Sequence, residues 1–250
     1  MKILSWNVNG LRAVYHRNFL EWTKRSKADI LCLQEIKAQK EDLPQELINF
    51  KGYISYFNFA TKKGYSGVAI YSRIPATLIN YNLGIRRFDR EGRFLELSYP
   101  QFTLINLYLP HGGRKKENLS YKLRVYGTLL KYLRRKKDQT LILIGDFNIA
   151  HQEIDLARPK ANKNNIMFTP KERIQIDNII SVGFCDTFRK FHQEGGWYTW
   201  WPYYAKARER NLGWRIDYCF VSESLCSKIK DAFIDSKTRG SDHCPIGIEF

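Results

Sequence analysis

Leu141-Ile142-Leu143-Ile144-Gly145-Asp146-Phe147-Asn148 is a short apolar run that ends abruptly in polar side chains. Branched apolar residues in succession, stopped by a glycine, are typical of a buried strand. A similar pattern occurs at the N-terminus, where an apolar strand ends in Trp6-Asn7-Val8-Asn9-Gly10. Both runs place polar carbonyl side chains just beyond a buried strand, which favours a cleft where several strand ends converge.

Other short apolar runs have the length of strands, and most are bounded by Gly, Pro, Asn or Asp. With the two above, the predicted strands are 2–8, 29–33, 68–71, 94–97, 102–109, 141–144, 216–221 and 246–250. One helix face is predicted from the spacing of Leu119, Leu123, Tyr126, Leu130 and Leu133.

Two more helices are predicted, one from Tyr15, Phe19 and Trp22, and one carrying Ile176, Ile179 and Ile180. The second would begin at Thr169-Pro170, with the threonine as cap and the proline in the first helical position. Strands and helices mixed in this way, without a Pro/Gly/Ser-rich linker, predict a single layered α/β or α+β domain over residues 1–250.

The charge balance predicts a polyanionic partner. The net charge is +16, from 41 Lys and Arg against 25 Asp and Glu. Basic side chains that pair with phosphates release condensed counterions, so this surplus is typical of nucleic-acid-binding proteins. An anionic membrane surface is the second candidate, and a role in solubility is the alternative without a partner.

Cysteine usage predicts a reducing environment. The five cysteines lack a paired spacing such as CxxC, and three of them lie in apolar runs where a thiol behaves as a small hydrophobe: Cys32, Cys185, Cys219, Cys226 and Cys244. The N-terminus does not resemble a signal peptide, and no apolar run has the length of a membrane span. We therefore predict a soluble intracellular protein, cytoplasmic or associated with the nucleoid.

Carboxylates that directly follow buried strands predict a metal site. Glu35 follows Leu31-Cys32-Leu33-Gln34, and Asp146 follows the run 141–144. A buried carboxylate is costly unless a cation or hydrogen-bond donors compensate it. Asn7, Glu35 and Asp242 offer only oxygen atoms, which suit Mg²⁺ or Mn²⁺ better than zinc. Each residue alone is equally typical of a cap or a turn, but their joint occurrence favours an ion.

An acid and a histidine form a second candidate pair. Alternation along the predicted strand turns Arg215 and Asp217 to the same face, so that Asp217 can approach His243 on a neighbouring loop. Carboxylates fix the tautomer of an imidazole in many hydrolytic sites. A purely structural hydrogen bond is the alternative.

Six motifs occur here in the order found in one family. They are Trp6-Asn7-Val8-Asn9-Gly10-Leu11-Arg12, Leu33-Gln34-Glu35, Tyr108-Leu109-Pro110, Gly145-Asp146-Phe147-Asn148, Trp214-Arg215-Ile216-Asp217-Tyr218 and Ser241-Asp242-His243-Cys244-Pro245. The chain therefore resembles the exonuclease III family of apurinic/apyrimidinic (AP) endonucleases, part of the endonuclease/exonuclease/phosphatase (DNase I-like) superfamily. The resemblance covers almost the whole chain. It implies a four-layer α/β sandwich in which two mixed β-sheets pack face to face and are flanked by helices.

The resemblance also implies roles for the acids. Glu35 resembles the principal ligand of Mg²⁺, for which Mn²⁺ can substitute, and Asn7 and Asp242 match positions nearby. Asp146 resembles the residue that activates or positions the attacking water. Asn148 resembles its orienting or phosphate-binding neighbour. The resemblance leaves open whether a second ion is also bound, by Asp146, Asn148 and His243.

Contacts to the phosphate follow from the same resemblance. His243, oriented by Asp217, resembles the group that stabilises charge in the pentacovalent state, and Tyr108 resembles a tyrosine that contacts the scissile phosphate. Two positions depart from the family pattern. His111 stands where many members have Asn, which puts one phosphate hydrogen bond in doubt. Asn9 stands where some members have Asp, which removes one acidic ligand.

The aromatic and basic segment 197–210 suggests how a substrate is held. An enzyme that acts on a base-less nucleotide must hold the exposed sugar in an apolar pocket that a normal base would overfill. By resemblance, Trp200, Trp214 and Ile216 line this pocket, and Arg114 on the loop after Tyr108 reaches DNA. The alternatives are rings that belong to the core and a solvated basic loop.

The resemblance implies a monomeric enzyme that hydrolyses the phosphodiester 5′ to an abasic site in double-stranded DNA, a step of base excision repair. Activity as a 3′–5′ exonuclease or 3′-phosphatase would use the same centre. One alternative is another metal-dependent phosphodiesterase of the superfamily, which the segment 197–210 argues against. Another is a non-catalytic nucleic-acid-binding module, which the presence of all the acids argues against.

Overall fold

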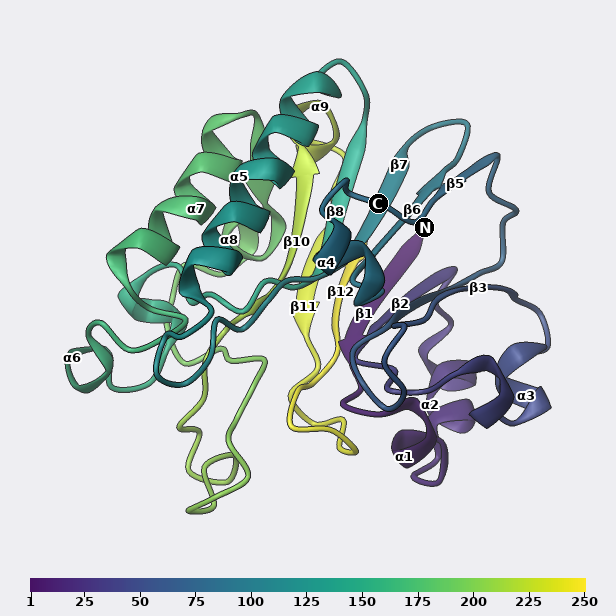
Figure 1. Cartoon of the computed structure of the whole chain (residues 1–250), viewed down its shortest axis with the longest axis horizontal. Helices are drawn as coiled ribbons and strands as arrows, with labels where there is room; N and C mark the ends of the chain where they lie inside the picture. Colours follow the sequence, from purple (N-terminus) through teal and green to yellow (C-terminus); the bar gives the residue numbers. More distant parts are fainter.

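Two six-stranded β-sheets form the centre of the computed structural model, which describes all 250 residues (Figure 1). The first sheet has the order β11-β12-β1-β2-β4-β3, and the second has the order β5-β6-β7-β8-β10-β9. Each sheet contains one parallel pair, β1 with β2 and β7 with β8, among antiparallel neighbours. Both sheets are therefore mixed, as predicted.

The strands lie close to their predicted positions. The first sheet contains β1 (Lys2–Asn7), β2 (Ile30–Gln34), β3 (Ile54–Asn58), β4 (Val68–Ser72), β11 (Asp231–Ile234) and β12 (Ile246–Glu249). The second contains β5 (Leu78–Asn80), β6 (Phe94–Ser98), β7 (Thr103–Tyr108), β8 (Leu141–Asp146), β9 (Phe184–Asp186) and β10 (Asp217–Ser222). All the predicted strands are confirmed.

The four strands that the sequence did not predict are the edge strands of the two sheets: β3, β5, β9 and β11. Each of them has exposed or half-buried residues, whereas β2, β4 and β8 are buried throughout. Strands that are buried on both faces have continuous apolar sequences. Edge strands are partly exposed and include polar residues, and they therefore lack this pattern.

Helices cover the outer faces of both sheets and complete four layers, which confirms the expected sandwich (Figure 1). They are α1 (Leu11–Tyr15), α2 (Phe19–Ser26), α3 (Gln45–Ile48), α4 (Arg86–Arg90), α5 (Leu119–Arg135), α6 (Pro159–Asn162), α7 (Pro170–Ser181), α8 (Thr187–Phe191) and α9 (Glu223–Cys226), with 3₁₀ turns at Lys40–Asp42 and Glu153–Asp155. Side chains of α5 and α7 pack on the second sheet, and those of α1, α2 and α3 pack on the first. None of these helices is long and apolar enough to cross a membrane.

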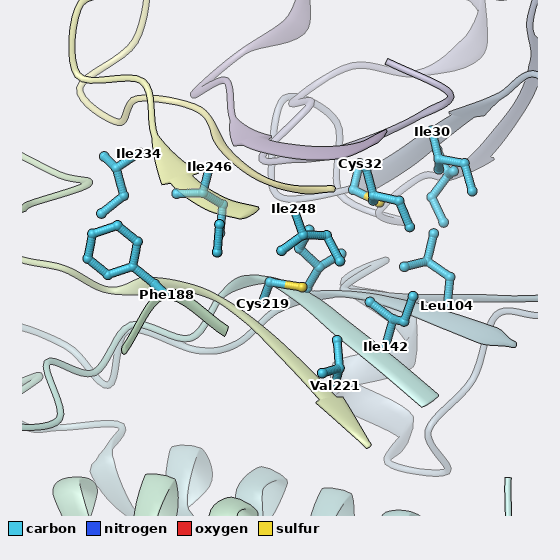
Figure 2. Close-up of a cluster of buried hydrophobic side chains, with 14 of the residues drawn as sticks. Ile30, Cys32, Leu104, Ile142, Phe188, Cys219, Val221, Ile234, Ile246 and Ile248 are labelled. Carbon is cyan, nitrogen blue, oxygen red and sulfur yellow. The ribbon is translucent and has the colours of Figure 1, made fainter. Parts of the chain in front are cut away.

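The main core lies between the sheets, where side chains from both point toward one another (Figure 2). Ile30 and Ile246 of the first sheet belong to one buried cluster with Ile142 and Val221 of the second. Successive residues of a strand face opposite sides, so every central strand contributes to this core and also to a helix-covered face. Full burial on both sides explains why these strands are continuous apolar runs.

Two helices and one pair of cysteines differ from what the sequence predicted. The first predicted helix is interrupted between α1 and α2, where Asn18 has a left-handed backbone (φ 68°). Thr169 does cap α7, but Ile180 on that helix is exposed. Cys185 and Cys226, which no spacing had paired, form a disulfide between β9 and α9. The other three cysteines, Cys32, Cys219 and Cys244, are buried free thiols.

A buried polar bridge fixes one sheet against the other. Asn106 of β7 is fully buried, and its Nδ2 donates to the carbonyl oxygens of Leu33 (3.0 Å) and Ala69 (2.9 Å) in the first sheet. Its Oδ1 accepts from Nε2 of Gln34 at 2.7 Å. Buried polar groups tolerate little displacement, because each lost partner leaves an unsatisfied donor or acceptor. The bridge therefore sets the position of residue 35 relative to Tyr108.

The change Asn106→Ala is expected to lower the free energy of unfolding by about 2–4 kcal/mol, because it strands Gln34 and two carbonyl groups in the core. Urea denaturation monitored by circular dichroism measures this loss. Asn82→Ala, at an exposed position, is the matched control and should change stability by less than about 0.5 kcal/mol. Equal stabilities of the two variants would contradict the structural role of the bridge.

Candidate active site

A cluster of acids and one histidine lies where the two sheets meet at one end. Glu35 follows β2, Asp146 ends β8, and His243 lies on the loop before β12. Each offers one ligand atom, and these atoms all lie within 4.8 Å of one another. The parallel pairs β1/β2 and β7/β8 bring these strand ends together, because the carboxyl ends of parallel strands meet at one edge of a sheet.

Asn7, at the end of β1, joins the two sheets at this cluster. Its Nδ2 donates to Oε1 of Glu35 (3.0 Å) and to Oδ2 of Asp146 (2.9 Å). Its Oδ1 accepts from the backbone N–H of Asn9 at 3.1 Å. The amide therefore spaces two carboxylates that would otherwise repel each other.

Glu35 is held as an anion by a lysine that the sequence analysis did not single out. Burial alone would raise the pKa of Glu35, but the charge of Lys37 and hydrogen bonds from Lys37 and Asn7 outweigh it and lower the pKa. Nζ of Lys37 lies 2.7 Å from Oε2 of Glu35, and it also donates to the side chain of Asn9. The sequence signal was weak, since a lysine two residues after a motif acid is common on a surface.

The imidazole of His243 lies between the carboxylates of Asp146 and Asp217. Asp217 at the start of β10 pairs with Asp146 across the sheet, and its Oδ2 lies 2.8 Å from Nδ1 of His243. Nε2 of the same imidazole lies 3.9 Å from Oδ2 of Asp146. Burial, together with Asp217, raises the pKa of Asp146 to about 8. Burial would lower the pKa of His243, but the surrounding acids raise it to about 10.

The acids of this cluster outnumber its cations. A bound metal ion would supply the missing positive charge. The pKa of Asp146 is raised because its ionised form is desolvated among other acids. Oδ1 of Asp217 is buried without a hydrogen-bond partner. Carboxylate oxygens and one imidazole are ligands for divalent cations. The cluster of Glu35, Asp146 and His243 therefore offers ligand atoms that fit a divalent metal ion.

Tyr108 and Asn148 border the cluster from neighbouring strand ends. Burial and the charge of Glu35 raise the pKa of Tyr108 well above its ordinary value, so its phenol is a neutral donor. The guanidinium of Arg93 lies 4.2 Å from the centre of its ring. Asn148 donates from its backbone N–H to Oδ1 of Asp146 (2.8 Å) and from Nδ2 to the carbonyl of Leu109 (2.9 Å).

A hollow of about 600 Å³ opens beside the cluster; we call it the tryptophan hollow, lined among others by His111, Arg114, Lys116, Trp200, Trp214 and Asp242. Three of the four residues expected to meet the substrate line this hollow. Ile216 does not: it is 1% exposed and packs behind the two tryptophans. Trp201 and Tyr198 of the same segment are core residues, whereas Tyr203 and Tyr204 are each 73% exposed.

Asp242 lies outside the cluster that holds Glu35, although the sequence analysis grouped the two as metal ligands. Its Oδ2 accepts from Nε1 of Trp200 at 3.0 Å, and its Oδ1 accepts from Nδ2 of Asn9 at 2.8 Å. Asp242 thus braces a wall of the tryptophan hollow. His111 presents a donor to the same hollow, because its Nδ1 accepts from the N–H of Gly113 and leaves Nε2 to carry the proton.

Comparison with known proteins agrees with this geometry. The model of the endonuclease/exonuclease/phosphatase family matches residues 4–243. An exodeoxyribonuclease of Bacillus subtilis is 45% identical over 98% of both chains. The chain belongs to this family, in its exonuclease III branch.

This exonuclease III family member is similar to solved structures over its whole fold. An AP endonuclease from Archaeoglobus fulgidus is 32% identical, has a TM-score of 0.92, and covers 100% of this chain and 99% of its own. A 3′ phosphatase from Neisseria, solved with a product DNA hairpin, is 31% identical with a TM-score of 0.93 and the same coverage. The family is one of hydrolytic, metal-dependent nucleases.

This exonuclease III family member carries one buried lysine, Lys122 on α5, that the sequence pattern of the helix did not reveal. Lys122 is fully buried, and its Nζ donates to the carbonyls of Asn148 (2.6 Å) and His111 (3.1 Å) and to Oε1 of Glu172 (2.6 Å). Leu119 and Leu123, predicted to be on the buried face, are only half-buried. Lys122 thus ties two site loops to α7.

The change Lys122→Met is expected to destabilise the protein by about 3–5 kcal/mol, because it leaves the buried Glu172 carboxylate unpaired. The double change Lys122→Met with Glu172→Gln should recover part of this loss, since it removes the unpaired charge. Urea denaturation measures both values. Lys131→Met, on the exposed face of the same helix, is the control. A Lys122 variant as stable as this control would refute the assignment.

Proposed function

We propose that this protein is a divalent-metal-dependent AP endonuclease that hydrolyses the phosphodiester 5′ to an abasic site in double-stranded DNA. The observation that carries the proposal is the position of the Glu35–Asp146–His243 cluster beside the tryptophan hollow. The cluster suits phosphoester hydrolysis, and the hollow offers aromatic walls and basic groups to a base-less nucleotide. The net charge of +16 supports a polyanionic substrate.

The residues divide the chemistry among them. Mg²⁺, or Mn²⁺ in its place, held chiefly by Glu35 would supply a Lewis acid that neutralises charge on the phosphate. His243, kept protonated by Asp217, donates toward a phosphate oxygen as negative charge develops there. Tyr108 is a second neutral donor. These groups are fixed before the substrate arrives, which is what phosphoryl transfer chiefly requires of a protein.

The attacking water needs a base and a fixed orientation. Asp146 is the nearest candidate base, with its two oxygens already directed by Asn7 and by the N–H of Asn148. Asn148 would orient the water or the phosphate from the same turn. His111 would donate the hydrogen bond that many family members obtain from an asparagine.

The tryptophan hollow would accept the base-less sugar between Trp200 and Trp214, with Arg114 and Lys116 near the DNA backbone. We infer that residues 1–250 act as one domain and as a monomer. The protein would act in the cytoplasm or on the nucleoid, where its DNA substrate lies. Activity as a 3′–5′ exonuclease or 3′-phosphatase is consistent with the same centre, since Neisseria proteins of similar structure are named for these reactions.

Metal binding should depend on Glu35 and not on Asp242. Because Glu35 lies in the cluster and Asp242 is engaged by Asn9 and Trp200, Glu35→Gln is expected to weaken Mn²⁺ binding at least tenfold, about the lower limit for a perturbed metal site. Asp242→Asn should change it by less than about twofold. Electron paramagnetic resonance of free Mn²⁺ measures both affinities without any substrate. The reverse order would make Asp242 the principal ligand.

Cleavage should depend on Asp146. With Mg²⁺ and a duplex containing one abasic site, the wild-type protein is expected to cut 5′ to the site, and Asp146→Asn should be slower by about 10²–10⁴-fold because the proposed base is lost. Asp138→Asn, at an exposed position, is the matched control and should retain full activity. Equal cleavage by wild type and Asp146→Asn would refute the role of Asp146, and no cleavage by wild type would refute the substrate.

A further inference from the structure

A second basic hollow lies beside α4, apart from the metal cluster and the tryptophan hollow. We call it the α4 hollow; its volume is about 640 Å³, and its walls include Lys62, Tyr65, Arg86, Arg87, Arg90 and Glu91. Four of these six side chains are cations and one is an acid. Such a surplus around one hollow suits an anionic ligand.

The acids around this hollow are already engaged. Glu91 accepts from Nε of Arg87 at 3.0 Å and from Nε of Arg93 at 2.5 Å, so it is shared by two guanidinium groups. Asp89, the only acid on α4, accepts from backbone N–H groups of the loop before the helix, at 2.8 and 3.1 Å. Neither carboxylate is left to neutralise the remaining cations.

Three cations of the hollow are unpaired. Lys62, Arg86 and Arg90 are exposed and form no salt bridge. Arg86 and Arg90 are also four residues apart on a helix of five residues, which places two like charges on one face. Such a pair destabilises a helix, and an anion bound between the two side chains would relieve the repulsion.

The α4 hollow is connected to the metal cluster through one arginine. The hydroxyl of Tyr65, a wall residue of the hollow, accepts from Nη2 of Arg93 at 2.8 Å. The same guanidinium lies over the ring of Tyr108 and donates to the Tyr108 carbonyl at 3.2 Å. Tyr108 in turn borders Glu35. Only Arg93 and Tyr108 therefore separate the hollow from the acids.

The loop 111–118 separates the two hollows. Its residues His111, Arg114 and Lys116 line the tryptophan hollow. Its last residue, Asn118, accepts from Nη1 of Arg87 in the wall of the α4 hollow at 3.2 Å. The two basic surfaces thus lie on opposite sides of one loop, and Arg93 and Tyr108 lie between the α4 hollow and the metal cluster.

We propose that the α4 hollow binds backbone phosphates of the DNA duplex, on the flank that lies across the loop 111–118 from the tryptophan hollow. This inference rests on the proposed function, because it assumes that a duplex lies across the metal cluster. Duplex DNA carries one negative charge per ≈ 1.7 Å of its axis, so a duplex seated there presents phosphates beyond the reacting one. Contacts to phosphates position the duplex without selecting a sequence.

Salt-dependent binding tests the hollow directly. Fluorescence anisotropy would measure the binding of a 30-base-pair duplex with a tetrahydrofuran abasic analogue, in EDTA, from 50 to 200 mM KCl. The double change R86Q/R90Q should reduce the slope of log K against log salt by roughly 1.8, about 0.9 for each lost phosphate contact. At 50 mM KCl the dissociation constant should rise by about tenfold or more.

The matched control is K131Q/R134Q, which removes the same charge from exposed positions of α5. Lys131 lies twelve residues beyond Leu119, about 18 Å along the helix from the site loops. This control should keep the wild-type slope apart from a small general charge effect. The R86Q/R90Q protein should unfold at or above the wild-type temperature, because the like-charge pair is gone, so weak binding cannot be ascribed to unfolding.

Shortened duplexes locate the contact. When the flank that reaches the α4 hollow is removed, wild type and R86Q/R90Q should bind alike, and removal of the other flank should leave their difference intact. Equal slopes for R86Q/R90Q and K131Q/R134Q on the full duplex would overturn this inference while wild-type cleavage of abasic DNA stands. Absence of that cleavage would overturn the proposed function instead.

Discussion

Repulsion among buried carboxylates is the constraint around which this structure is organised. Glu35, Asp146 and Asp217 converge near one imidazole, that of His243, at the shared end of two sheets. Burial disfavours the ionised carboxylate and the neighbouring Asp217 adds like-charge repulsion, and together they raise the pKa of Asp146 to about 8. Asn7 and Lys37 reduce the cost with donors and charge. A divalent cation would complete the compensation.

Such a cluster exists only because the surrounding fold prevents its members from moving apart. The bridge from Asn106 to the first sheet fixes the two sheets in register, and Lys122 fixes the loops that carry Asn148 and His111. Arg215 is nearly fully buried, and it binds Asp155 and Asp186 at 2.7 and 2.8 Å beside the strand that begins at Asp217. These polar contacts are fully desolvated, so breaking one leaves a buried group unpaired.

In the proposed function, the reacting groups and the groups that bind the rest of the substrate occupy different parts of the same surface. The acids and the histidine belong to strand ends and to the loop before β12, and the two sheets fix the position of these elements. The tryptophan hollow and the α4 hollow are built by loops and by a short helix, which can vary without disturbing the sheets. Such a division would let proteins of one fold act on different substrates, and the relatives do carry names as different as exodeoxyribonuclease, AP endonuclease and 3′ phosphatase.

The amino-acid pattern alone predicted the central strands, the longer helices and the acids of the centre. Strands buried on both faces are continuous apolar runs, and the carboxylates Glu35 and Asp146 stand out because they end such runs. Edge strands such as β3 and β11 were not predictable in this way, since their half-exposed faces carry polar residues. Other features emerged only from the packing of the folded chain: Asp242 braces Trp200, Ile216 lies behind the hollow, and Lys37, Asn106 and Lys122 hold groups of the site. Their roles depend on partners distant in sequence, and sheet register and loop packing, not local pattern, decide which groups meet.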